Sequence, residues 1–322
     1  MKYDLISVGN AIVDVIASCP EDFLTEEAMN KGDMALIDKD RAVHLYGRMG
    51  DKVETSGGAN ANIAVGFAQC AKAAGEGTVG YVGKVANDAL GDTYVADIEA
   101  QGVTYCAPRD ETSNPTGRSM IFVTPDGERT MNTFVGAATE LSTAHLPKEV
   151  FSNAKIVCIE GYMYAEPCTQ EAILEAARMT KAAGGQVSVT MSAFFIADVF
   201  RPVLQAWIDE GLIDILFANQ KEAEIFAETE DFEQALAKLA AQVPHVVVTR
   251  SELGSVTMAN GQRYDVPTKP VAKVVDATGA GDNFAAGYLY GIAMGESITD
   301  ASLRGAKMGA AVIQQIGPRL PA

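Results

Sequence analysis

Residues 276–287 read DATGAGDNFAAG, a glycine-rich turn that runs into an apolar segment. Small residues at 279–281 let the backbone approach a ligand closely, and the apolar stretch 284–294 predicts a buried helix just after them. The first amides of a helix have no partner within it and lie at the positive end of its dipole. The stretch therefore predicts an anion site suited to a phosphoryl group.

Asp282 directly follows this predicted anion site. A carboxylate there cannot bind phosphate, because like charges repel, but it can take a proton from an alcohol that attacks phosphorus. The alternative interpretation is an ordinary aspartate cap on a helix that follows a glycine turn. The twelve residues by themselves leave both interpretations open.

The composition is typical of a large α/β protein of a reducing cytoplasm. The chain has 322 residues, enough for a sizeable core, and a net charge of −17, which argues against nucleic acids and anionic membranes as partners. Its five cysteines are scattered without a Cys-x-x-Cys pair, so neither a disulfide scaffold nor a zinc site is expected. We find no secretory signal and no apolar stretch long enough to cross a bilayer.

Short β-branched or apolar runs alternate with alanine-rich helical stretches along the chain. The predicted strands are 3–8, 78–82, 156–159, 187–190, 213–218 and 246–249, and the predicted helices include 60–74, 169–183 and 231–241. This alternation predicts an α/β fold with a mostly parallel sheet covered on both faces. Ligands are then expected at the carboxyl ends of the strands.

Two segments break the alternation and predict a small β-rich lid. They are residues 17–56 and residues 103–136, the second with an expected hairpin around Pro125 to Gly127. The remaining segments, 1–16, 57–102 and 137–322, would form the large domain.

Three polar clusters gain meaning if the protein transfers a phosphoryl group. Gly57, Gly58 and Asn62 lie where a helix should start, Asn10 and Asp14 follow the first strand, and Asn219 and Glu222 follow the strand 213–218. The first two clusters can hydrogen-bond the hydroxyls of a polar substrate, and the third can place oxygen ligands near a hydrated Mg²⁺. Glycine turns, helix caps and solvated loop residues are the alternatives.

The sequence supports neither of two common nucleotide-binding motifs, the dinucleotide fingerprint and the P-loop. Gly75, Gly77 and Gly80 have the spacing of a dinucleotide fingerprint, but a predicted helix precedes them and a predicted strand follows, the reverse of the required order. A P-loop sequence is also absent. An NAD-dependent oxidoreductase is therefore disfavoured, and any ATP must be held without a P-loop.

Across essentially its whole length the chain resembles the ribokinase-like, or PfkB, carbohydrate and nucleoside kinases. The resemblance is carried by residues 276–282 with Phe284 and Gly287, and by residues 57–62 followed by Gly80, Gly83, Asp88 and Gly91. It implies a three-layer αβα sandwich with a β-rich lid, and a kinase that transfers the γ-phosphoryl of ATP to an alcohol.

The resemblance also implies roles for particular residues. Asp282 would be the catalytic base, and the amides of Gly279, Ala280 and Gly281 the anion hole. Asn219 and Glu222 would organise magnesium and phosphate. Asp14 would grip ribose hydroxyls with Gly58 and Asn62 beside it, and Asp276 and Thr278 match positions that bind a monovalent cation such as potassium in many members.

The nucleotide loop departs from the family pattern. The family's T-x-G-x-x-G loop is present here from Thr249 to Gly254, with Ser251 in place of the first glycine. Gly9 and Asn10 with Asp14 resemble the adenosine kinase branch of the family, which implies the 5′-hydroxyl of adenosine as acceptor. The alternative is a sugar kinase that acts on free ribose or fructose. We expect a monomer rather than a homodimer.

Overall fold

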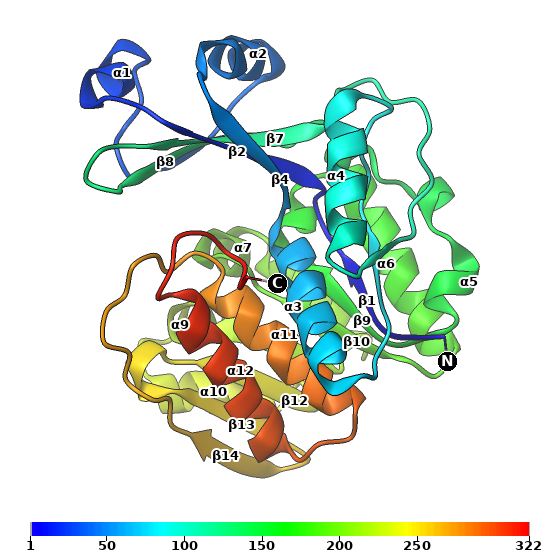
Figure 1. The fold of residues 1–322 in the computed structure, drawn as a ribbon. Helices are drawn as coiled ribbons and strands as arrows, with labels where there is room; N and C mark the ends of the chain where they lie inside the picture. The colour runs from blue at the N-terminus through cyan, green and yellow to red at the C-terminus, as the bar shows by residue number, and fades with distance from the viewer. Residues whose placement is uncertain (1, 322) are drawn as a thin grey trace.

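The computed structural model describes residues 2–321 and places most of its strands in one sheet (Figure 1). The sheet order is β14 (Gln262–Val266), β13 (Ser255–Ala259), β12 (His245–Thr249), β11 (Ile215–Asn219), β10 (Gln186–Thr190), β9 (Ala154–Glu160), β1 (Tyr3–Val8), β5 (Val79–Val82) and β6 (Thr104–Tyr105). Pairing is parallel from β6 to β12, and β13 and β14 are antiparallel. The expected mostly parallel α/β sheet is confirmed.

Helices cover both faces of this sheet. On one face lie α3 (Ala59–Ala74), α11 (Ala280–Ala293) and α12 (Ile298–Val312); on the other lie α6 (Pro167–Ala182), α9 (Gln220–Phe226) and α10 (Phe232–Ala240). Successive side chains of β9 enter different cores: Ile156 and Cys158 join the first, Val157 and Ile159 the second. Strands buried on both faces read as continuous apolar runs, which is why they were predictable.

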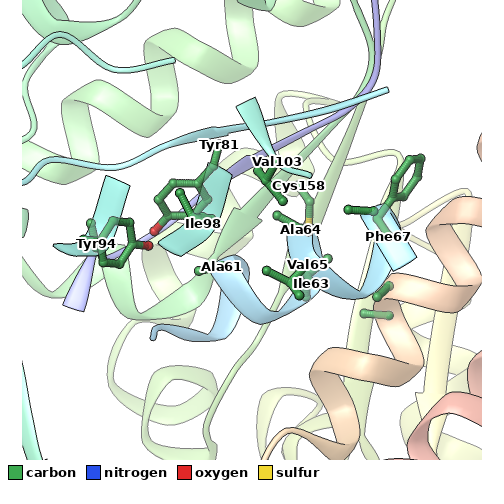
Figure 2. Packing of buried hydrophobic residues seen from close by; sticks show 14 of the residues in the cluster. Ala61, Ile63, Ala64, Val65, Phe67, Tyr81, Tyr94, Ile98, Val103 and Cys158 are labelled. Atoms are coloured by element: carbon green, nitrogen blue, oxygen red, sulfur yellow. The ribbon is translucent and has the colours of Figure 1, made fainter. Parts of the chain in front are cut away.

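Helix α3 is buried along most of its length and lies directly against α11. Figure 2 shows its apolar side chains beside Tyr81 of β5 and Tyr94 of α4 (Ala89–Ala100). Gly66 permits the close approach of α11, because a Cβ there would lie 2.7 Å from the Cβ of Ala286. This contact brings the start of α3 close to the start of α11.

A second, smaller sheet projects from the body at the upper left of Figure 1. Its order is β3 (Met34–Leu36), β8 (Arg129–Phe134), β7 (Gly117–Val123), β2 (Ile12–Ser18) and β4 (Lys52–Gly57), with α1 (Glu21–Glu26) and α2 (Lys39–Arg48) beside it. The predicted hairpin forms as β7 and β8. Residues 12–16, which we expected in the large domain, thus join the smaller sheet, and residues 104–105, which we expected in the lid, join the larger one. The division into two domains itself stays a prediction.

The remaining elements are short helices that link the strands. They are α5 (Lys148–Phe151), α7 (Phe194–Val199), α8 (Arg201–Asp209) and the 3₁₀ turns Gly136–Glu140, Thr143–His145, Gly161–Ala165 and Ser251–Leu253. Among residues 2–321 we find no helix with the length and apolar character needed to cross a membrane.

Candidate active site

A cavity of ≈ 360 Å³ opens where the central parallel strands end and α11 begins. Its lining includes Thr190, Asn219 and Thr249, at the ends of β10, β11 and β12, together with residues 277–282. Carboxyl ends of parallel strands meet at one edge of the sheet, which explains why polar residues far apart in sequence gather here.

The start of α11 forms one wall of this cavity. Gly279 is the N-cap residue with φ of +76°, and a Cβ there would lie 2.6 Å from the carbonyl oxygen of Pro318, so this position requires glycine. The space beside Gly281 is open. The Ala280 amide already donates to the carbonyl of Ala277 at 3.2 Å, so only its neighbours keep the free amides that an anion hole needs.

Asp282 lies in the first turn of α11 and does not cap it. Its Oδ2 accepts a hydrogen bond from Nδ2 of Asn62, at the start of α3, at 2.9 Å. The cap interpretation is therefore wrong: Gly279 caps the helix, and the carboxylate faces the cavity. Burial raises the pKa of Asp282 to about 6, opposed by the Asn62 hydrogen bond and the charge of Arg319. A carboxylate poised near neutral pH is suited to general-base catalysis.

Asp14 lies on β2, where it pairs with Thr55 of β4, and its side chain reaches Gly57 of the same strand. Burial raises its pKa to about 6, opposed by the charges of Arg319 and Arg129. A Cβ on Gly57 would lie 2.5 Å from Cγ of Asp14, so this glycine makes room for the carboxylate. The next residue, Gly58, has φ of +97° and lies against the backbone of Asn10, which again requires glycine.

The carboxylate of Glu160, at the end of β9, is a site group that the sequence reasoning missed. It is buried, accepts from the backbone amide of Asn60 at 3.1 Å, and lies 3.4 Å from Nδ2 of Asn10. Burial, helped by the charge of Asp282, raises the pKa of Glu160 to about 8, opposed by hydrogen bonds from Asn60 and Asn10. Its place at the carboxyl end of a predicted strand was the available signal.

Asp276, an expected cation ligand, is engaged by protein groups. Its Oδ2 lies 2.9 Å from Nη1 of Arg129, at the start of lid strand β8, and accepts from the amide of Gly317. Its Oδ1 accepts from the amide of Thr278 at 2.9 Å. The ion pair joins the lid to the glycine-rich loop, and Nη2 of Arg129 is buried without a hydrogen-bond partner among the described residues.

Asn219 and Glu222 form a capping box at the start of α9. Asn219 Oδ1 accepts from the amide of Glu222, and Glu222 Oε2 accepts from the amide of Asn219. The helix-start alternative thus describes their local structure, yet both residues line the cavity. One carboxylate and one amide fit a magnesium ion that keeps several waters and binds substrate phosphates. Within residues 2–321 no cluster of three or more acidic, His or Cys side chains suits a metal ion.

The nucleotide loop lies after β12. Thr249 ends that strand and lines the cavity, and Gly254 has φ of +87°. Ser251, where the family has glycine, adopts φ of +50°, a left-handed conformation that side chains rarely take. The rejected dinucleotide motif is also explained, because Gly75 ends α3 in a left-handed cap, as a glycine after a helix often does.

The sheet, the lid and the cavity with its glycine loop and poised aspartate define a phosphotransferase that acts on an alcohol. The chain belongs to the pfkB family of carbohydrate kinases, whose sequence profile matches residues 28–322.

Individual relatives match the whole chain. Adenosine kinase 2 of Arabidopsis thaliana is 28% identical over 347 residues, which cover 99% of this chain and 97% of that protein. The crystal structure of adenosine kinase from Sinorhizobium meliloti is 43% identical with a TM-score of 0.89, covering 100% of this chain and 97% of that one. A probable sugar kinase from Rhizobium etli is 44% identical with a TM-score of 0.88, covering 99% and 95%.

Proposed function

We propose that this protein is an adenosine kinase, which moves the γ-phosphoryl of ATP to the 5′-hydroxyl of adenosine. The observation that carries the proposal is Asp282, a half-buried carboxylate with a pKa near 6 beside the open amides of the glycine-rich loop. Asp282 accepts the hydroxyl proton as the 5′-oxygen attacks the γ-phosphorus, while the bond from that phosphorus to the β-phosphate oxygen breaks and ADP leaves. The amides of Gly279 and Gly281 stabilise the charge that develops on the transferred group.

The acceptor is assigned from the lid side of the site and from the relatives. Asp14 on β2 offers two carboxylate oxygens to a vicinal diol, with Gly57 directly beside it. In this proposal Asn10, Gly58 and Asn62 complete the acceptor site. The Arabidopsis and Sinorhizobium proteins that match over the whole chain are adenosine kinases. The Rhizobium etli match supports a sugar kinase as the second candidate.

ATP occupies the cavity side of the glycine-rich loop in this proposal. Thr249 and Gly254 would border its nucleotide, and Asn219 and Glu222, which line the cavity with Thr249, would hold its magnesium through water. Magnesium there neutralises phosphate charge. Arg129, whose Nη2 is buried and unpartnered among the described residues, can add a donor from the lid.

The remaining proposals concern the surroundings of the reaction. We propose a cytoplasmic monomer whose lid, residues 17–56 and 103–136, excludes water, and hence little ATP hydrolysis without an acceptor. A monovalent cation near Asp276 and Thr278 would share that carboxylate with Arg129. Comparing turnover in potassium chloride and in tetramethylammonium chloride tests the cation.

The acceptor is tested with purified protein, ATP and magnesium against adenosine, inosine, guanosine, ribose and fructose. We expect the highest kcat/KM for adenosine, with AMP as product identified by phosphorus NMR. A higher kcat/KM for ribose or fructose would replace the proposal with the sugar kinase. Transfer to none of the five acceptors would reject both.

A further inference from the structure

Arg319 enters the site from the segment that follows α12. Its Nε donates to Oδ1 of Asn62 at 2.9 Å, and its Nη1 donates to Oγ of Ser56 at 2.8 Å. The same Nη1 lies 3.4 Å from Oδ2 of Asp97, which also accepts from the amide and hydroxyl of Ser56. The side chain is only 15% exposed. Through Ser56, Asn62 and Asp97 it contacts lid strand β4, α3 and α4 at once.

These contacts determine which way the Asn62 amide points. Its oxygen accepts from Arg319, so its NH₂ group faces Oδ2 of Asp282 at 2.9 Å. An amide rotated by 180° would present oxygen to the carboxylate and NH₂ to the guanidinium, pairing acceptor with acceptor and donor with donor. The guanidinium carries no acceptor and cannot lose its proton, so it permits one orientation only.

We propose that Arg319 is a positioning residue for phosphoryl transfer, which locks the Asn62 amide as a donor to Asp282 and so holds the base ionised and aimed at the acceptor hydroxyl. The inference rests on the proposed role of Asp282 as the base. It concerns a residue outside the glycine-rich loop that contacts the base only through Asn62.

The acidic surroundings of Asp282 make the positive charge of Arg319 important. The groups that act on it or feel its charge are Asp14 on β2, Cys158 and Glu160 on β9, Tyr162 in the following turn, and Arg319. Of these, Asp14 raises the pKa of Asp282, and Arg319 lowers it along with the Asn62 hydrogen bond. Loss of the guanidinium is therefore expected to raise the pKa of the base.

The backbone around Arg319 is held by contacts that do not use its side chain. Gly317 donates to Asp276, Asn283 Nδ2 donates to the carbonyl of Pro318 at 2.7 Å, and Gln69 Nε2 donates to the carbonyl of Leu320 at 2.8 Å. A substitution of the side chain should therefore leave this segment in place.

The test compares Arg319→Met with wild type. We expect kcat to fall about 10- to 100-fold at pH 7, the order expected for a hydrogen bond to a charged group, and KM values to change little. Part of the loss should be recovered at pH 8.5, because a higher pKa of Asp282 moves the acidic limb of the kcat profile to higher pH. Guanidinium ion added to Arg319→Ala should restore part of the turnover.

Arg304→Met is the matched control. Arg304 lies on α12, pairs with Glu296 and packs over Tyr290, away from the cavity. Its loss should leave kcat and the pH profile unchanged.

A second readout does not depend on turnover. Carbon-13 NMR of labelled aspartate, with Asp282→Asn to assign the signal, measures the pKa of Asp282 in the ligand-free protein. We expect a higher pKa in Arg319→Met than in wild type, and an equal pKa in both would overturn the inference. A raised pKa in a protein that phosphorylates no acceptor would instead reject the proposed function and leave the coupling intact.

Discussion

The glycine-rich loop and the lid side of the site are built in opposite ways. The loop side, from Gly279 to Asp282, is contiguous in sequence and takes its shape from the start of one helix. The lid side brings Asp14 and Gly57 together from paired strands. One ion pair, Arg129 to Asp276, joins the two sides. We conclude that the proposed catalytic groups are encoded locally, whereas the proposed acceptor-binding groups depend on how the strands of the smaller sheet pair.

Asp282→Asn should give the largest effect, because it removes the proposed general base from the loop side of the site. A general base supplies about 10²- to 10⁴-fold in rate, so kcat should fall by that order while KM values change little. Steady-state kinetics with adenosine and ATP measures it. Near-normal turnover in this isosteric variant would show that another group takes the proton.

Gly57→Ala breaks the lid side instead. The new Cβ would lie within 2.6 Å of the Asp14 carboxylate and displace it, so KM for the acceptor should rise about 10- to 100-fold, with a smaller change in kcat. Gly50→Ala is the control in the same lid, since no atom lies within 4 Å of a Cβ there. An unchanged acceptor KM in Gly57→Ala would remove Asp14 from the acceptor site.

Acidic pH should affect the two sides together, because burial raises the pKa of both Asp282 and Asp14 to about 6. Below about pH 6, kcat should fall about tenfold per pH unit as the base is protonated. Acidic pH should change stability in the opposite direction to kcat. A folded-state pKa above the unfolded value means that the folded form binds protons more tightly, so their contribution rises as pH falls from about 6 to about 4.

Thermal unfolding of wild type, Asp14→Asn and Asp282→Asn at pH 7 and pH 5 checks this sign. The neutral amides should stabilise the ligand-free protein at pH 7, and the difference should shrink at pH 5. A gap that widens on acidification would mean that the two carboxylates are stabilised, not penalised, in the fold.

Ser251→Gly should give the smallest effect. The left-handed backbone at φ of +50° costs a side chain about 1 to 2 kcal/mol, partly offset by the entropy that glycine loses on folding, so the gain in unfolding free energy should be up to about 1 kcal/mol. Ala28→Gly, at φ of +52° in the lid, should gain similarly. Only Ser251→Gly should alter KM for ATP, and a loss of stability in both variants would contradict the strain.

The fold was largely predictable because its signals are local. The strands at 3–8 and 246–249 are apolar runs bounded by turns, and α3 is a run of small apolar residues; the structure confirms all three. Strands β13 and β14 were not predicted, because β13 mixes polar and apolar residues although most are buried, and β14 is mostly exposed, so neither shows a clear period.

The site was predictable only in part. Asp282 and the glycines beside it carry a local signal, and so does Asn62. Glu160 had only its place at a strand end. Arg129 and Arg319 had no signal, because one lies in a lid strand and the other beyond the last helix, and only the folded chain brings them to the carboxylates.

By itself the sequence determined the α/β alternation, the glycine-rich loop at the start of α11 and the carboxylate beside it, because each depends on neighbours within a few residues. Only the tertiary structure decided that Gly279 rather than Asp282 caps that helix, that Asn62 is held between Arg319 and Asp282, and that Asp276 pairs with the lid. The physical reason is that burial and charge pairing, which set the pKa and the orientation of a side chain, come from residues distant in sequence.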